Sequence, residues 1–198
     1  KFLKTLPDEQ MTSGYAEILK HGLIHSEAYW NLAAKFDITN KAETDKLIWG
    51  SVLIKNEVIT EDPNENGLRK TLNYGHTLGH AIESYLLEHH SKKALLHGEA
   101  IAIGMILATY ISAEELTFPK SKLEAVTRTV LQNFPKVTFN NLDIEEIIKL
   151  LIYDKKNNNG KVYFVLLSDF GKHKTNKEVS NVLIYRAFEY YKNFQKSI

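Results

Sequence analysis

Residues 69–83 read RKTLNYGHTLGHAIE, and the interpretation of the whole chain depends on this stretch. His76 and His80 are four residues apart, so on a helix they lie one turn apart on a single face. Gly75 and Gly79 precede the two histidines and leave room for a close approach of backbone or ligand. Such a pair is a common way for one helix to present two imidazoles to a metal ion. The alternative is a pair of buried histidines satisfied by hydrogen bonds.

Two further polar residues of this stretch favour a site for an anionic substrate. Arg69 has a permanent positive charge, and Asn73 adds an amide that can donate or accept hydrogen bonds. The residues before them, 62–67, read DPNENG, which is a strong turn signal. The stretch therefore begins directly after a turn and continues into an apolar helical run.

The composition of the 198-residue chain is that of an ordinary globular protein, with 43% hydrophobic and 25% charged residues. A net charge of +1 and two short basic clusters, at 92–93 and 155–156, do not indicate binding to nucleic acid or a membrane surface. There are no cysteines, so any metal site must use His, Asp and Glu, and a cytoplasmic location is expected. No signal peptide is visible, and no apolar run approaches the roughly 20 residues of a membrane helix.

Apolar periodicity predicts a mainly α-helical chain. The predicted helices cover residues 14–24, 26–36, 44–62, 122–134, 143–153 and 180–194, together with one that contains His76 and His80 and one that begins near Leu95. Ser13 is expected to cap the first helix. Residues 162–167, with Gly171 beyond them, predict a short strand or hairpin. The sequence thus indicates a single domain over residues 1–198, with about eight helices and one short β-hairpin.

Several polar residues lie in apolar surroundings. Glu17 and Lys20 are three residues apart and face the same way, either as a solvated surface pair or as part of a site. Lys55 lies within the apolar stretch of residues 44–62, either as a snorkelling lysine or as a buried cation directed at a ligand. His97 opens an almost wholly apolar helix, where it could be a third metal ligand or a packed polar residue.

Together these residues could form a catalytic metal site. One carboxylate and two neutral imidazoles are a familiar zinc ligand set that leaves a position open for substrate. Cationic side chains around such a site suit a substrate with carboxylate and phosphate groups, and a remaining histidine could carry a proton. The residues considered are Glu17, Lys20, Lys55, Arg69, Asn73, His76, His80, His97, Lys155 and Lys156.

Five segments, in order and over nearly the whole chain, resemble 3-dehydroquinate synthase. They are SGYAEILKHGLI at 13–24, Lys55 fourteen residues before Arg69, GLRKTLNYGHTLGHAIE at 67–83, LHGEA at 96–100 and DKK at 154–156. Tyr74 stands where that family more often has Phe. The resemblance is to the helical C-terminal domain, and it implies a dehydroquinate synthase-like or glycerol dehydrogenase-like C-terminal fold.

The resemblance implies a role for each matching residue. Glu17, His76 and His97 match the ligands of Zn²⁺, or of Co²⁺ in its place. His80 matches a histidine near the substrate phosphate that helps in proton transfer. The other catalytic and substrate-binding positions are matched by Lys20, Lys55, Arg69, Asn73 and one lysine of the DKK motif, for which Lys156 is favoured over Lys155. Glu65 also matches a position near the site.

The resemblance also implies a reaction in aromatic amino acid biosynthesis, the second step of the shikimate pathway. Members of the family are lyases that convert 3-deoxy-D-arabino-heptulosonate 7-phosphate into 3-dehydroquinate and phosphate. They do so through transient oxidation by NAD, phosphate elimination, reduction and aldol closure. An N-terminal domain that would precede Lys1 binds the NAD, and this chain has no Gly-x-Gly-x-x-Gly motif of its own. We therefore expect the chain alone to be inactive and the whole enzyme to be a homodimer.

Two other classes of function remain open. Other sugar phosphate cyclases and metal-dependent polyol dehydrogenases also combine an NAD domain with a helical metal domain, although the many cations favour an anionic substrate over glycerol. A non-catalytic helical scaffold with structural histidines is the second class. It predicts no tight metal binding, and an effect of His76→Ala on stability alone.

Overall fold

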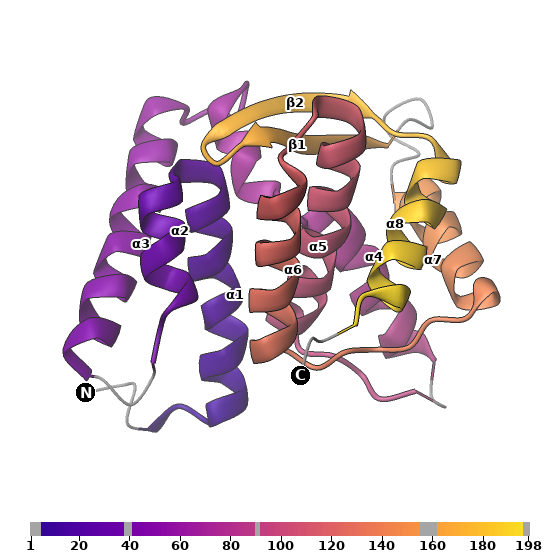
Figure 1. The fold of residues 1–198 in the computed structure, drawn as a ribbon, viewed down its shortest axis with the longest axis horizontal. Helices are drawn as coiled ribbons and strands as arrows, with labels where there is room; N and C mark the ends of the chain where they lie inside the picture. The colour runs from indigo at the N-terminus through magenta and orange to yellow at the C-terminus, as the bar shows by residue number, and fades with distance from the viewer. Residues whose placement is uncertain (1–4, 38–40, 90–91, 155–161, 196–198) are drawn as a thin grey trace.

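The computed structural model describes residues 5–37, 41–89, 92–154 and 162–195 of the chain. Within these ranges it has eight α-helices, a 3-10 helix and a two-stranded hairpin, which confirms the predicted mainly helical fold (Figure 1). In chain order the elements are α1 (Asp8–His25), α2 (Glu27–Ala34), α3 (Lys41–Glu61), η2 (Leu68–Asn73), α4 (His76–Glu88), α5 (His97–Leu116), α6 (Lys120–Asn133), α7 (Asn141–Asp154), β1 (Tyr163–Asp169), β2 (Lys172–Glu178) and α8 (Asn181–Asn193).

Helix α5 lies at the centre of the molecule. Its residues 100–109 are buried without interruption, as expected for a helix whose sequence is apolar on all sides. It packs against α1, α4, α6, α8 and β1. Figure 1 shows α5 and α6 in the middle, α1, α2 and α3 on one side, and α7 and α8 on the other. Helix α5 therefore fixes the positions of the elements that carry the candidate site.

The hairpin closes one end of this helical core (Figure 1). Strands β1 and β2 are antiparallel, with Leu167 opposite His173, and Gly171 in the turn has a φ of 71°. Residues 164–167 of β1 are buried, and β1 packs against α5, whereas β2 alternates between exposed and partly buried residues. The β element predicted from residues 162–167 is therefore confirmed.

Helix α1 begins earlier than the sequence pattern indicated. The helix starts at Asp8, directly after Pro7, and not near residue 14. Asp8 and Glu9 occupy its first turn, where the helix dipole favours negative charge. Ser13 consequently lies inside the helix, and the prediction that it caps α1 is wrong.

Helix α3 buries a narrower stripe than its apolar sequence indicated. Leu47 and Ile54 are buried, but Trp49 and Val52 keep 63% and 50% of their surface exposed. Apolar residues occur on both faces of this helix, so their spacing alone does not show which face packs against the core. Lys55 is exposed as well, which excludes the interpretation of a buried cation at this position.

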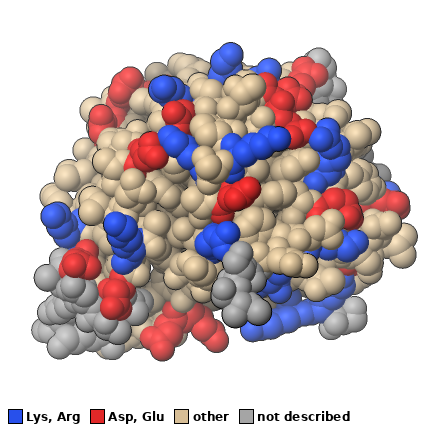
Figure 2. Space-filling view, in the orientation of Figure 1, with Lys and Arg blue, Asp and Glu red and all other residues tan. Residues whose placement is uncertain are grey.

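The molecular surface carries both signs of charge. Figure 2 shows basic and acidic side chains interspersed over the visible face, in keeping with the net charge of +1. None of the helices in the described parts of the chain has the length and apolar character needed to cross a membrane.

Candidate metal centre

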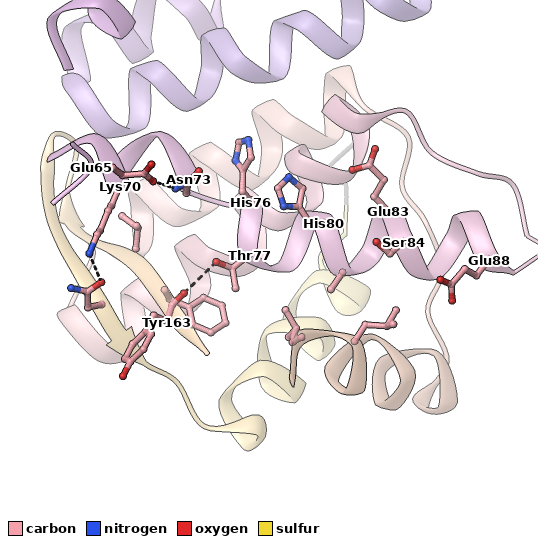
Figure 3. Close-up of a pocket in the computed structure, with 16 residues that line it drawn as sticks. Glu65, Lys70, Asn73, His76, Thr77, His80, Glu83, Ser84, Glu88 and Tyr163 are labelled. Atoms are coloured by element: carbon pink, nitrogen blue, oxygen red, sulfur yellow. Dashed lines mark hydrogen bonds between the residues drawn. The ribbon is translucent and has the colours of Figure 1, made fainter. Parts of the chain in front are cut away.

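Three histidines converge where α4 and α5 begin. His76 and His80 lie in the first two turns of α4, and His97 is the first residue of α5. Their ring centroids are 5.2 Å apart for His76 and His80, 5.6 Å for His76 and His97, and 5.5 Å for His80 and His97. One nitrogen of each ring lies within 4.8 Å of the others, close enough to act on a common metal ion. Figure 3 shows His76 and His80 projecting from the same face of α4.

Glycines allow the two helices to touch at this point. A Cβ atom on Gly104 would lie 2.1 Å from the carbonyl oxygen of Gly75, and a Cβ on Gly79 would lie 3.0 Å from the Cα of Ile101. Gly75 also has a φ of 78°, a conformation that favours glycine. The close approach predicted at Gly75 and Gly79 is therefore an approach to the backbone of α5.

Ser13 brings helix α1 to the same place. Its Oγ accepts a hydrogen bond of 2.9 Å from the backbone N–H of Gly98, one of the free donors in the first turn of α5. A Cβ on Gly98 would lie 2.1 Å from the carbonyl oxygen of Ser13, so only glycine fits there. Ser13 thus caps α5 from outside, and Glu17 lies one turn further along α1.

Glu17 has different surroundings on its two carboxylate oxygens. Its Oε2 accepts a hydrogen bond of 2.7 Å from the Nζ of Lys20, whose side chain is only 3% exposed. Its Oε1 is buried without a hydrogen-bond partner among the described residues and lies 3.6 Å from the Nε2 of His76. Burial raises the pKa of Glu17, but the charge and hydrogen bond of Lys20 outweigh it and hold this pKa below its usual value. Glu17 and Lys20 therefore do not form a solvated surface pair.

His76 presents an unprotonated nitrogen to this carboxylate. Its Nδ1 lies 3.2 Å from the carbonyl oxygen of Tyr74, which can only accept a hydrogen bond, so the proton is on Nδ1. Burial, with the nearby charge of Lys20, lowers the pKa of His76 to about 4, which keeps the ring neutral at pH 7. The Nε2 lone pair therefore faces the unpartnered Oε1 of Glu17. Two acceptors facing each other in a buried place fit a bound cation, as metal-ligating residues would.

His97 has a matching arrangement on the other helix. Its Nδ1 lies 3.0 Å from Oε2 of Glu83, on α4. The side chain of His97 is 48% exposed, so it can also reach a ligand in solution. Of the three histidines, two therefore have Nδ1 occupied by an acceptor and Nε2 available. Glu83 was missed in the sequence, although it lies seven residues after His76 on the same helical face.

The other residues predicted for the site are placed around it and not all in contact with it. Lys55 is exposed on α3. Burial lowers the pKa of Lys20, and the positive charge of Lys55 lowers it further by a smaller amount. Arg69 donates a hydrogen bond of 2.7 Å to the carbonyl oxygen of Pro63, and the Asn73 amide donates one of 2.9 Å to Glu65. The last two predicted positions, Lys155 and Lys156, lie outside the described residues.

A cleft of about 880 Å³ runs along α4 next to the histidines (Figure 3). Its walls come from η2, α4, α7 and the hairpin, and it includes His76 and His80. Lys70 is the one Lys or Arg among the described lining residues, and its Nζ donates to the Oδ1 of Asn176 over 3.2 Å. The lining residues are Glu65, Lys70, Asn73, His76, Thr77, His80, Ala81, Glu83, Ser84, Glu88, Leu150, Leu151, Tyr163, Phe164, Val165 and Asn176.

Comparison with known sequences supports one family. Residues 14–157 match the family model described as 3-dehydroquinate synthase C-terminal. A 3-dehydroquinate synthase of Parabacteroides distasonis is 37% identical over 193 residues, which cover 96% of this chain and 54% of that protein. One of Thermodesulfovibrio yellowstonii is 37% identical over 185 residues, covering 90% of this chain and 50% of that protein. The chain thus spans about half the length of the curated relatives it matches.

Comparison with solved structures gives the same architecture. A 2-epi-5-epi-valiolone synthase from Streptomyces hygroscopicus, solved with NAD⁺ and Zn²⁺ bound, superposes with a TM-score of 0.77 at 21% identity over 96% of this chain and 53% of that one. A 2-deoxy-scyllo-inosose synthase, complexed with carbaglucose-6-phosphate, NAD⁺ and Co²⁺, has a TM-score of 0.68 at 28% identity over 92% of this chain and 51% of that one. The first of these likenesses shows the fold alone.

Proposed function

Since this chain belongs to the 3-dehydroquinate synthase family, we propose that it is the metal- and substrate-binding C-terminal domain of such an enzyme. The whole enzyme would convert 3-deoxy-D-arabino-heptulosonate 7-phosphate into 3-dehydroquinate and phosphate. It would be a cytoplasmic homodimer, and an N-terminal half would hold NAD⁺. The relatives are about twice as long as the matched region, which leaves room for that second half.

The observation that supports this proposal best is the unpartnered Oε1 of Glu17 facing the Nε2 of His76. With His97 they give a set of one carboxylate and two imidazoles, as in catalytic zinc sites with an open position. Oxygen and nitrogen ligands of this kind suit Zn²⁺ or Co²⁺, and solved relatives of this fold contain these two ions. We assign Glu17, His76 and His97 as ligands and assign a different task to His80.

When bound, the metal would polarise the substrate hydroxyl that is oxidised, and NAD⁺ would accept the hydride. The residues of this chain position the substrate and move protons. His80 lines the cleft beside His76 and can take up or release a proton at a ring nitrogen near the substrate phosphate. Lys55, Arg69 and Lys156 are assigned to the anionic groups of the substrate, which depend on positive charge for their orientation.

Lys20 and Asn73 complete the assignment. The Nζ of Lys20 is bound to Glu17 and nearly inaccessible, so its first effect is to hold the carboxylate ionised and oriented. The family resemblance adds a contact between Lys20 and the substrate. Asn73 is exposed at the end of η2 and turns its amide toward Glu65, on the wall of the cleft.

The test is turnover by the whole enzyme that contains this chain, measured as phosphate release from the heptulosonate phosphate in the presence of NAD⁺ and zinc. Activity should fall by about 100-fold or more in Glu17→Gln, since loss of a metal ligand should cost at least as much as loss of a residue that only orients a ligand. The exposed Glu9, on the same helix, is a matched control as Glu9→Gln and should leave activity unchanged. This chain alone should release no phosphate. Unchanged activity of Glu17→Gln would contradict the assignment.

A second candidate is another sugar phosphate cyclase. It is favoured by the 28% identity to a 2-deoxy-scyllo-inosose synthase of the same fold. The two candidates differ in the acid group of the substrate, since a heptulosonate carries a carboxylate and a hexose phosphate does not. Assaying glucose 6-phosphate beside the heptulosonate phosphate separates them. Conversion of the heptulosonate alone is the expected result.

A further inference from the structure

Glu83 is a charged residue in the interior of α4 whose position the fold does not explain. It lies in the third turn of the helix, away from both ends, so it neither caps the helix nor compensates its dipole. Among the interactions described for this chain, its carboxylate has one partner, the Nδ1 of His97 at 3.0 Å. The side chain is 30% exposed and belongs to the wall of the cleft.

The hydrogen bond determines which nitrogen of His97 is available. A carboxylate oxygen accepts the hydrogen bond, so a ring of His97 that carries one proton has it on Nδ1 and has the lone pair on Nε2. The other histidine assigned as a ligand, His76, has its proton held on Nδ1 by the carbonyl oxygen of Tyr74. Both rings are thus prepared in the same tautomer, one by the backbone just before α4 and the other by a side chain of α4.

We propose that Glu83 is a positioning residue for the metal centre, which holds His97 in the tautomer and orientation that direct Nε2 to the ion. This inference rests on the proposed function, because it takes His97 as a ligand. It adds a residue to which the resemblance assigned no role. An acceptor behind a ligating imidazole fixes the ring and raises its basicity, and losing it typically weakens metal binding 10- to 100-fold.

The exposure of the two rings explains why His97 needs a side-chain acceptor to fix its orientation more than His76 does. His76 is only 14% exposed and is enclosed by its neighbours, whereas the side chain of His97 is 48% exposed at the very start of α5. An exposed side chain rotates among several rotamers unless a partner selects one. Glu83 reaches across from α4 and provides that partner.

The experiment is a zinc-affinity measurement by competition with a chromophoric chelator. The proteins are the wild-type chain, Glu83→Ala, Glu83→Gln and the matched control Glu88→Ala. Glu88 is an exposed carboxylate of the same helix and the same cleft wall. We expect Glu83→Ala to bind zinc 10- to 100-fold more weakly. Glu83→Gln should fall between it and wild type, because the amide oxygen still accepts a hydrogen bond. Glu88→Ala should bind like wild type.

The tautomer of His97 gives a second readout that does not need metal. In long-range ¹H–¹⁵N spectra of the metal-free chain, the ring of His97 should carry its proton on Nδ1 in the wild type. Glu83→Ala should shift it toward the mixture of tautomers seen for a free imidazole. A merely structural role of Glu83 would not produce this change. Thermal unfolding of the metal-free variants shows whether each is folded.

His97→Ala separates this inference from the proposed function. If His97→Ala binds zinc as tightly as wild type, the ligand assignment itself is wrong and the inference falls with it. If His97→Ala loses zinc while Glu83→Ala keeps wild-type affinity and the Nδ1 proton, the ligand assignment stands and the role of Glu83 is overturned. In the His97→Ala background, adding Glu83→Ala should have no further effect on affinity.

Discussion

The two carboxylate oxygens of Glu17 have opposite hydrogen-bonding states. Its Oε2 is neutralised by a nearly inaccessible lysine, and its Oε1 is left buried and unpartnered beside a neutral imidazole. A buried acceptor without a partner costs on the order of 1–3 kcal/mol, so such groups persist where a ligand satisfies them. The structure therefore indicates a cation site through a missing hydrogen bond as well as through converging side chains.

Residue spacing alone could predict the histidines but not this feature. The four-residue spacing of His76 and His80 requires them to share a helical face, and the structure confirms it. That Glu17 has one free oxygen depends on the rotamer of Lys20, which sequence does not reveal. The same holds for Glu83, because its partner His97 is on another helix and fourteen residues away.

Below neutral pH, the buried His21 should destabilise the fold. Its Nδ1 lies 2.6 Å from the Oγ of Ser51, between α1 and α3, and burial, with the charge of Lys20, lowers its pKa to about 4. As the pH falls through about 6.5, the unfolded chain binds a proton at His21 and the folded chain does not. The free energy of unfolding is therefore unaffected by His21 above pH 6.5 and decreases from there toward pH 4.

Replacing His21 should flatten this dependence. The free energy of unfolding, measured with urea, should fall between pH 7 and pH 5 in both proteins. The fall should be larger in the wild type than in His21→Asn by on the order of 1–2 kcal/mol. Some slope remains in the variant, because the pKa of His76 is lowered in the same direction. The exposed His89, replaced as His89→Asn, is the control. Equal slopes for His21→Asn and wild type would show that His21 does not contribute.

At the scale of elements, the contact between α1 and α5 depends on Gly98. A methyl group there would meet the Ser13 carbonyl oxygen at 2.1 Å, so Gly98→Ala must push the two helices apart. We expect a loss of about 1–3 kcal/mol in the free energy of unfolding. Zinc affinity should also fall, because α1 carries Glu17 and α5 carries His97. Denaturant titration and zinc competition measure the two effects.

Gly14 provides the matched control on α1. It is exposed, and a Cβ there would have no atom of the described residues within 4 Å. Gly14→Ala should therefore stabilise the helix by up to about 1 kcal/mol and leave zinc affinity unchanged. If Gly98→Ala were as stable as Gly14→Ala, the close packing of α1 on α5 would be disproved.

Asp143 connects α7 to α4 through one buried carboxylate. It exchanges hydrogen bonds with Asn140 at the start of α7 (2.7 and 3.0 Å), accepts one of 2.5 Å from Tyr85 of α4 and pairs with Lys92. Burial raises the pKa of Asp143, but the hydrogen bonds from Lys92, Tyr85 and Asn140 outweigh it and hold this pKa below its usual value. The ionised Asp143 therefore contributes to the free energy of unfolding above about pH 4, and this contribution is lost as the pH falls through the lowered pKa.

Asp143→Asn should lower the free energy of unfolding by about 2–3 kcal/mol at pH 7, because the charge that binds Lys92 is lost from a buried position. The difference from wild type should shrink once Asp143 itself is protonated at low pH. On the same helix, Glu146→Gln removes an exposed pair with Lys149 and should cost much less, because water screens this pair. Equal losses for the two variants at pH 7 would contradict this interpretation.

The elements show where sequence patterns were sufficient. Helix α5 was predictable because a helix that is apolar all round has to be enclosed, and the turn at residues 62–67 follows from side-chain hydrogen bonds of Asp62 to the backbone of Asn66 and Gly67. The role of Ser13 could not be predicted, because the donor that it caps lies 85 residues away in the sequence. Long-range caps leave no local signal.

At the scale of the whole molecule, the proposed metal centre lies where three helices meet and next to the open cleft. The ligand assignment takes Glu17 from α1, His76 from α4 and His97 from α5, so the centre depends on the packing of all three. The family resemblance of the sequence predicts the residues of this proposed centre, but the sequence does not predict the cleft. The walls of the cleft come from η2 and α4 in one part of the chain and from α7 and the hairpin in another, and these two parts meet only in the fold.

We infer that this chain builds a metal centre from Glu17, His76 and His97. Calorimetric titration of the metal-free chain with Zn²⁺ tests it most directly, with His76→Ala as the variant and His89→Ala, a histidine at the other end of α4, as the control. We expect one zinc per chain for wild type and His89→Ala, and binding weakened by about 100-fold or more in His76→Ala. Zinc bound equally tightly by His76→Ala, or no zinc bound by the folded wild-type chain, would contradict it.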